Sequence, residues 1–228
     1  MTQFDGFTQE TLQFLAAIKG NNNKQWFEKN KSIFKEEVQH KSQDFVMAMD
    51  DALKSISPEL GGDVRLNGSG SIFRIYRDVR FSKDKTPYKT HLGILFWDKR
   101  FKKMSGPGFY FHLEPPKLSL YCGVYEIPRD KMSDFRDGIA DNKSGKQLLE
   151  IIDKGEKMGF EISEPHYKRF PTGYDVEDER KTLLLHNTLF FKKTMTIPNE
   201  IFSENLIDYT LKVWEKMAPV YFWLKNIM

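Results

Sequence analysis

The 228-residue sequence contains a single cysteine, Cys122, and no long apolar run. One cysteine cannot form a disulfide within the chain, and it excludes a zinc site built on several thiolates. The longest apolar stretches, such as residues 93–97 and 188–191, fall well short of the roughly 20 residues that a membrane-spanning helix needs. The N-terminus carries Asp5 and Glu10 where a secretory signal needs basic and then apolar residues. We therefore expect a soluble, cytoplasmic protein without a membrane partner.

Motifs of several common enzyme classes are also missing. The five histidines show no HExxH spacing, and no GxSxG sequence is present to supply a serine nucleophile. Gly145 and Lys146 lack the other residues of a phosphate-binding loop. Gly68 and Gly70 precede an expected strand, whereas a dinucleotide-binding turn follows one. We predict no cofactor, and the sequence does not decide whether the protein is an enzyme.

Two of the histidines are candidate metal ligands. His91 and His112 fall on segments that are expected to form adjacent strands, and Glu114 follows nearby. Residues of these types can bind a metal ion. Histidines on strands are more often packed or exposed, however, so the sequence predicts no metal site.

The N-terminal quarter has a helical pattern of apolar residues. Thr8 as N-cap, an apolar stripe and Gly20 predict a helix over residues 8–19. Further apolar residues recur at helical spacing until Pro58, which predicts one long helix or two joined helices.

The pattern then changes to short segments rich in aromatic and β-branched residues, which predict strands. These expected strands cover residues 71–81, 91–98, 109–114 and 118–125. The last two are joined by only Pro115, Pro116 and Lys117, so they should form an antiparallel hairpin. We expect the sheet to be a meander.

Helical patterns return after the sheet. Pro128 should begin one helix, a capping box of Ser144 and Gln147 a second, and Asn199 a long final helix in which Pro219 introduces a kink. Other expected elements are an edge strand at 160–165, a polar loop at 166–179, a short helix at 183–185 and a late strand at 189–197.

Strands followed by helices, rather than alternating with them, predict an α+β fold, and no linker divides the chain. We therefore expect a single α+β domain over residues 1–228. A central, mostly antiparallel sheet (70–126) should be flanked by helical parts at 7–57 and 128–228.

Positive charge is concentrated in one segment. The chain has 35 basic and 32 acidic side chains, a formal net charge of +3. Residues 65–103 alone contain eleven basic and three acidic side chains, a net charge of +8. The densest part runs from Arg74 to His91, RIYRDVRFSKDKTPYKTH, with a turn favoured by Pro87. If the flanking strands pair, the cations come together, and two like charges 4 Å apart repel by about 1 kcal/mol in water.

Three ways of offsetting this repulsion remain open. A phosphate- or carboxylate-bearing small molecule could bind the cations, with His91 and Tyr88 as neighbouring groups suited to proton transfer. Nucleic acid or a protein could bind the same face. Alternatively, acidic side chains of the protein itself could pair with the cations, so that the segment is purely structural.

Each of these three hypotheses involves specific residues. The expected ligand-binding residues are Arg74, Arg77, Arg80, Lys85 and Lys89, supported by Asp78, Ser82 and Asp84. The face for nucleic acid would extend to Lys99, Arg100, Lys102 and Lys103. The acids available for internal pairing include Asp78, Asp84, Glu161, Glu164 and Glu177 to Glu179.

Several strings in the chain are similar to those of a known family. They are NNNKQWF (21–27), RDVRFSKDKTPYKTH (77–91), PGFYFHLEP (107–115), GVY (123–125) and KRFPTGYD (168–175). Together they resemble the bacterial and fungal family called domain of unknown function 2461, from about Phe7 to the C-terminal helix. The resemblance implies a single soluble α+β domain and assigns no catalytic role. It picks out Arg77, Asp78, Arg80, Phe81, Ser82, Asp84, Lys85, Pro87, Tyr88, Lys89 and His91 as signature residues.

Overall fold

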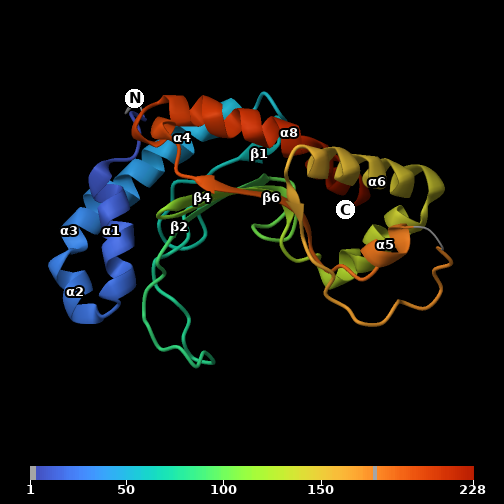
Figure 1. Cartoon of the computed structure of the whole chain (residues 1–228), viewed down its shortest axis with the longest axis horizontal. Coiled ribbons are helices and arrows are strands. Elements are labelled where there is room, and N and C mark those ends of the chain that lie inside the picture. Colours follow the sequence, from blue (N-terminus) through green and yellow to red (C-terminus); the bar gives the residue numbers. More distant parts are fainter. Residues whose placement is uncertain (1–3, 177–178) are drawn as a thin grey trace. The chain divides into compact units, whose positions relative to one another are not determined.

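Six strands form one antiparallel sheet, which confirms the predicted α+β class (Figure 1). The computed structural model describes residues 4–176 and 179–228. The strands pair in the order β1-β2-β3-β4-β6-β5. Their bounds are β1 Leu60–Gly61, β2 Leu92–Asp98, β3 Gly108–Glu114, β4 Lys117–Val124, β5 Glu161–Ile162 and β6 Leu189–Thr196. Because β2, β3 and β4 are neighbours in chain order, the predicted meander and its hairpin through Pro115 and Pro116 are confirmed.

The chain divides into two compact units, which are described separately. The first contains residues up to 96 together with 110–119 and 194–212. The second contains 97–109, 120–193 and 213–228. The prediction of a single domain remains a prediction.

In the first unit, the N-terminal helices form as the apolar pattern predicts. Helix α1 (Gln9–Gly20) begins after Thr8, whose side chain accepts a hydrogen bond from the Thr11 N–H. The second helical stretch is four joined segments: α2 Lys24–Lys29, α3 Lys31–Ile33, the π-helix η1 Phe34–His40 and α4 Lys41–Leu53. Strand β3 packs its Phe111 ring against Phe7 and Phe45, so the core lies between this strand and the helices.

In the second unit, η2 (Arg129–Lys131) and α5 (Met132–Ala140) follow Pro128, and α7 covers Arg180–Leu183. Helix α6 (Asn142–Lys157) departs from the predicted cap. Asp141, rather than Ser144, accepts hydrogen bonds from the first free N–H groups, so the helix begins earlier than expected. The edge strand β5 and the late strand β6 are confirmed.

The last helix also begins later than predicted. Residues Asn199–Phe202 form a short 3-10 turn, η3, and α8 then covers Asn205–Ile227 with Pro219 inside it. Within the described ranges, no helix is long and apolar enough to span a membrane.

The expected strand at 71–81 is wrong as a regular strand. Only isolated antiparallel bridges form, between Ile72 and Ile94 and between Tyr76 and Tyr88. Beyond Tyr76, Asp78 and Asp84 accept hydrogen bonds from backbone N–H groups two residues ahead. Such local turns compete with strand pairing. The result is an irregular loop that extends away from the sheet, seen in teal and green in Figure 1; we call residues 74–91 the basic hairpin.

Candidate functional site

The basic hairpin is fastened to the N-terminal helices by an asparagine side chain. The Asn22 amide donates to the carbonyl of Tyr88 (2.8 Å), and its oxygen accepts from the Tyr88 N–H (3.0 Å). The backbone groups of the flanking residues point to the opposite side, toward the other strand-like arm of the hairpin. There the Lys89 N–H donates to the Ile75 carbonyl (2.7 Å). Asn22 therefore takes the place of a neighbouring strand. This role of Asn22 is not predicted from the sequence. Asn22 lies in the string NNNKQWF and Tyr88 in the string RDVRFSKDKTPYKTH, so the two strings together contain both partners.

Tyr88 is a packing residue of this attachment. Its side chain is 3% exposed, and its ring stacks on Phe27 with 4.3 Å between the ring centroids. Burial is the main reason why its pKa is raised. The geometry gives Tyr88 a structural role, and its predicted part in proton transfer remains a prediction.

The outer cations of the hairpin pair with its own acids. Arg77 lies 2.6 Å from Asp84, and Arg80 lies 2.7 Å from Asp78. The hydrogen bond from Arg80 lowers the pKa of Asp78 to about 2. The Thr86 N–H, followed by Arg77, lowers the pKa of Asp84 to about 2. Internal pairing therefore occurs, but both acids are exposed rather than buried.

Other predicted residues of the tip have different surroundings. The Lys85 ammonium donates to the Val79 carbonyl (2.9 Å), and the Ser82 N–H donates weakly to the same residue (3.4 Å). Phe81 is 96% exposed, with the Arg80 guanidinium 5.8 Å from its ring centroid. Whether Arg77, Arg80 and Lys85 bind a ligand remains a prediction.

The predicted extension of the basic face belongs to the second unit. There the Lys99 ammonium lies 3.3 Å from the centroid of the Trp97 ring. Arg100 pairs with the buried carboxylate of Asp98 (2.7 Å). The predicted binding roles of these residues and of Lys102 and Lys103 remain untested. Of the more distant acids, Glu161 pairs with Lys192 (2.9 Å), whereas Glu177 lies outside the described residues.

The inner cations of the hairpin, Arg74 and Lys89, are arranged differently. Within residues 4–176 and 179–228, neither forms an ion pair with a carboxylate. The Lys89 ammonium lies 5.1 Å from the centroid of the Phe73 ring. Partial burial, and then the charge of Arg74, lower the pKa of Lys89. Two cations therefore lie close enough to affect one another without a neutralising acid.

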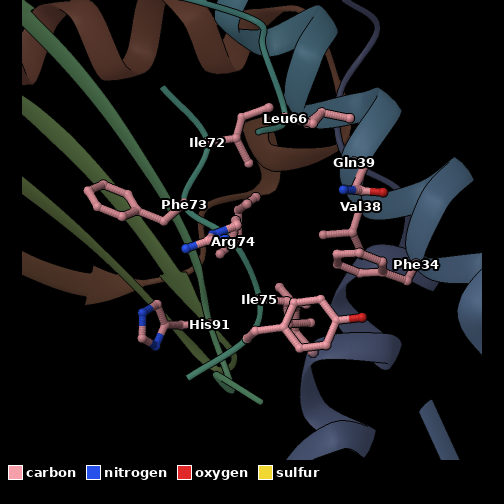
Figure 2. A pocket seen from close by; sticks show the side chains of 12 residues that line it. Phe34, Val38, Gln39, Leu66, Ile72, Phe73, Arg74, Ile75 and His91 are labelled. Atoms are coloured by element: carbon pink, nitrogen blue, oxygen red, sulfur yellow. The ribbon is translucent and has the colours of Figure 1, made fainter. Parts of the chain in front are cut away.

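A cavity of about 120 Å³ opens beside Arg74 (Figure 2). Its walls are mostly apolar and include Phe34, Val38 and Ile72, whereas Arg74 and His91 supply polar groups. Figure 2 shows Phe34 and Val38 on one side of the cavity and His91 on the other. Of the two predicted proton-transfer residues, His91 is the one that lines this cavity.

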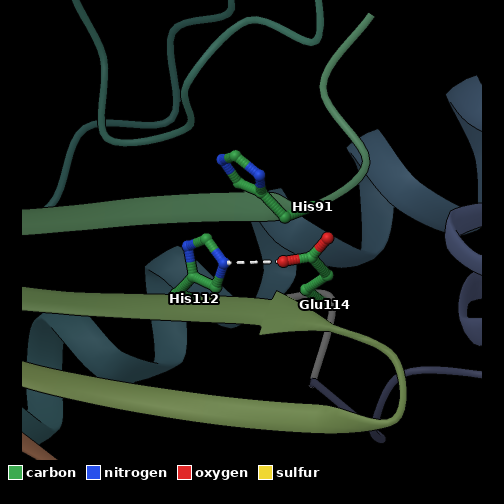
Figure 3. Close-up of side chains that lie close together, drawn as sticks. All are labelled: His91, His112 and Glu114. Carbon is green, nitrogen blue, oxygen red and sulfur yellow. Dashed lines mark ion pairs between the residues drawn. The ribbon is translucent and has the colours of Figure 1, made fainter. Parts of the chain in front are cut away.

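His91 also belongs to a cluster with His112 and Glu114 (Figure 3). The imidazole rings of His91 and His112 stack with 4.2 Å between their centroids. His112 Nε2 lies 3.6 Å from Glu114 Oε2, and the Thr90 hydroxyl donates to Glu114 Oε1 (2.8 Å). One nitrogen or oxygen atom of each of the three side chains lies within 4.8 Å of those of the other two. These are residue types that can hold a metal ion.

Neighbouring charges and burial set the protonation of this cluster. Burial is the largest reason why the pKa of His91 is lowered to about 4, and the charges of His112 and Lys89 add to it. Burial raises the pKa of Glu114, but hydrogen bonds from Thr90 and His112 outweigh this effect, so the pKa is lowered. At neutral pH, His91 is therefore uncharged and Glu114 is ionised.

The alternation of β3 explains why the cluster forms. Phe109, Phe111 and Leu113 are fully buried, whereas Tyr110, His112 and Glu114 are only partly buried. Successive side chains of a strand point to opposite faces. His112 and Glu114 therefore share the face that is not packed in the core, next to His91, which directly precedes β2.

Comparison with known proteins confirms the resemblance seen in the sequence. The family model described as "Conserved hypothetical protein (DUF2461)" matches residues 10–223. The chain belongs to this family. The matched range includes Asn22, the basic hairpin and the cluster on β3. No curated protein and no solved structure matches the chain, so its function has to be argued from its geometry.

Proposed function

We propose that this DUF2461 protein binds a small molecule with a phosphate or carboxylate group at the base of the basic hairpin. The observation that carries the proposal is the contrast between inner and outer cations. Arg77 and Arg80 have carboxylate partners, whereas Arg74 and Lys89 form no ion pair within the described chain. An anion bound between the inner cations would relieve their repulsion and raise the lowered pKa of Lys89 again.

The chemistry of these two side chains suits such a ligand. Arginine offers planar, paired N–H donors to the oxygens of a phosphate or carboxylate, and lysine adds a compact point charge. The adjoining cavity of about 120 Å³ is smaller than common ligand pockets of roughly 300–1,000 Å³. It therefore admits only a small apolar part of a ligand, and the anionic group would lie outside it, beside Arg74.

Thermal denaturation with added ligands tests this proposal. The panel should contain inorganic phosphate, phosphorylated metabolites and dicarboxylates at two salt concentrations. A ligand at 100 times its Kd stabilises the folded state by about 2.7 kcal/mol, which raises Tm by roughly 5–10 °C in a chain of this size. We expect the shift to disappear in Arg74→Gln/Lys89→Gln.

The matched control is Arg80→Gln, because Arg80 is an exposed cation of the same hairpin that already has a partner. This variant should keep the full shift. A shift that survives in Arg74→Gln/Lys89→Gln, or a panel in which no anion raises Tm, would overturn the proposal.

A second candidate is single-stranded nucleic acid at the tip of the hairpin. The observation that favours it is Phe81, which is 96% exposed beside Arg80 and near Lys83 in the sequence. An exposed aromatic ring can stack on a base while cations contact phosphates. Binding of a short oligonucleotide, measured by fluorescence anisotropy, should weaken steeply with salt and fall in Phe81→Ala. Binding unaffected by Phe81→Ala would exclude the tip as the contact.

A further inference from the structure

We propose that His91, His112 and Glu114 form a binding site for a divalent transition-metal ion such as Zn²⁺. The site is separate from the cations that carry the proposed function, and it can be tested without knowledge of the anion. The sequence predicts no metal at these residues, because histidines on strands are more often packed or exposed.

The set of ligands is the first argument. Two imidazoles and one carboxylate are a common protein contribution to zinc and iron sites, and they leave coordination positions open for water or substrate. His112 and Glu114 are two residues apart on β3, and His91 approaches from the start of the neighbouring strand. Figure 3 shows all three side chains on the same side of these strands.

The distances are the second argument. With bonds of about 2.0–2.2 Å in a tetrahedral arrangement, two ligand atoms lie roughly 3.4 Å from each other. His112 Nε2 and Glu114 Oε2 are already 3.6 Å apart, and one atom from each of the three side chains fits within 4.8 Å. Side-chain rotations that separate the stacked rings, without movement of the strands, would bring all three ligands to bonding distance.

Contacts around the cluster position two of the three side chains. The Thr90 hydroxyl donates to Glu114 Oε1, which fixes the carboxylate and leaves Oε2 directed at His112 (Figure 3). On the other side of that ring, the Tyr110 hydroxyl lies 3.5 Å from His112 Nδ1, which directs Nε2 toward Glu114. Metal-binding histidines and carboxylates are usually held by such outer contacts.

A proton on His112 is the competing explanation for the close approach of Glu114, because it would produce a simple ion pair. The positive charge of Lys89, which contributes to the lowered pKa of His91, opposes a further cation at the cluster. Arg74 lines the same cavity as His91, so a side chain that attracts anions lies near the cluster. If the proposed function holds, the bound anion can therefore lie between the metal and these two side chains.

The first experiment titrates the chelator-treated 228-residue chain with Zn²⁺ by calorimetry and with Co²⁺ by visible absorption. We expect one ion per chain and, with Co²⁺, d–d bands of a site with fewer than six ligands. His91→Gln, His112→Gln and Glu114→Gln should each lower the affinity at least tenfold. The matched control is His40→Gln, because His40 forms an exposed pair with Glu36 at 2.9 Å on one helical stretch. It should leave the affinity unchanged.

A second measurement needs no variant and so avoids any loss of folding. Nitrogen-15 NMR of the imidazoles should show Zn²⁺ shifting the ring signals of His91 and His112 but not that of His40. If His112 merely carries a proton, Zn²⁺ moves none of these signals. The absence of stoichiometric binding by wild type, or unchanged affinity in His91→Gln/His112→Gln, would overturn the proposal. Arg74→Gln/Lys89→Gln should still bind Zn²⁺, so the two proposals can fail separately.

Discussion

The attachment of the basic hairpin through Asn22 can be tested by Asn22→Ala. The substitution removes both hydrogen bonds to the backbone of Tyr88, a residue that is 3% exposed. A largely buried polar group without a partner costs about 1–3 kcal/mol, so the two groups together should cost about 2–6 kcal/mol. This is a large part of the 5–15 kcal/mol by which proteins are typically stable.

Chemical denaturation measured by circular dichroism gives the change in the free energy of unfolding. The matched control is Asn21→Ala, because the neighbouring Asn21 side chain donates only to the Ala17 carbonyl (2.9 Å) at an exposed position. We expect this control to cost less than about 1 kcal/mol. Hydrogen exchange at the Tyr88 amide should also accelerate in Asn22→Ala alone. Equal losses of stability in the two variants would refute the role of Asn22 as a substitute strand.

Two further predictions concern the face of β3 and the tip of the hairpin. A Cβ at Gly93 would overlap the Tyr110 hydroxyl, so Gly93→Ala should lower stability by about 1–3 kcal/mol, and adding Tyr110→Phe should recover part of this loss in denaturation experiments. The pKa values of Asp78 and Asp84 are lowered to about 2. The stability that their ion pairs contribute is therefore complete at a pH above about 4, the ordinary carboxyl pKa, and is lost as the pH falls through about 2. Carboxyl carbon NMR should show both midpoints near 2, and Arg80→Gln should raise that of Asp78 but not that of Asp84.

The sequence predicts the regular parts of the fold because apolar periodicity determines them. The residues of β3 alternate between buried and partly buried positions, and the predicted strand at 109–114 matches the observed one closely. Caps are harder to place, since Asp141 and Ser144 are both good caps and only the three-dimensional structure selects between them.

The candidate site is only partly accessible to such reasoning. The concentration of cations in residues 74–91 is evident in the sequence. Which cations have a carboxylate partner in the described chain depends on local turns at Asp78 and Asp84. The sequence also places His91 and His112 on adjacent strands. It contains no signal for the register that stacks their rings 4.2 Å apart.

The alternation along β3 has a consequence for how natural variation in this family should be read. Selection for folding alone acts on Phe109, Phe111 and Leu113, since these side chains are fully buried. It places much weaker demands on His112 and Glu114, which are only partly buried. If both sets of positions are conserved among family members, two separate selective pressures act on alternate residues of this strand. The buried residues are then conserved for stability and the partly buried ones for chemistry.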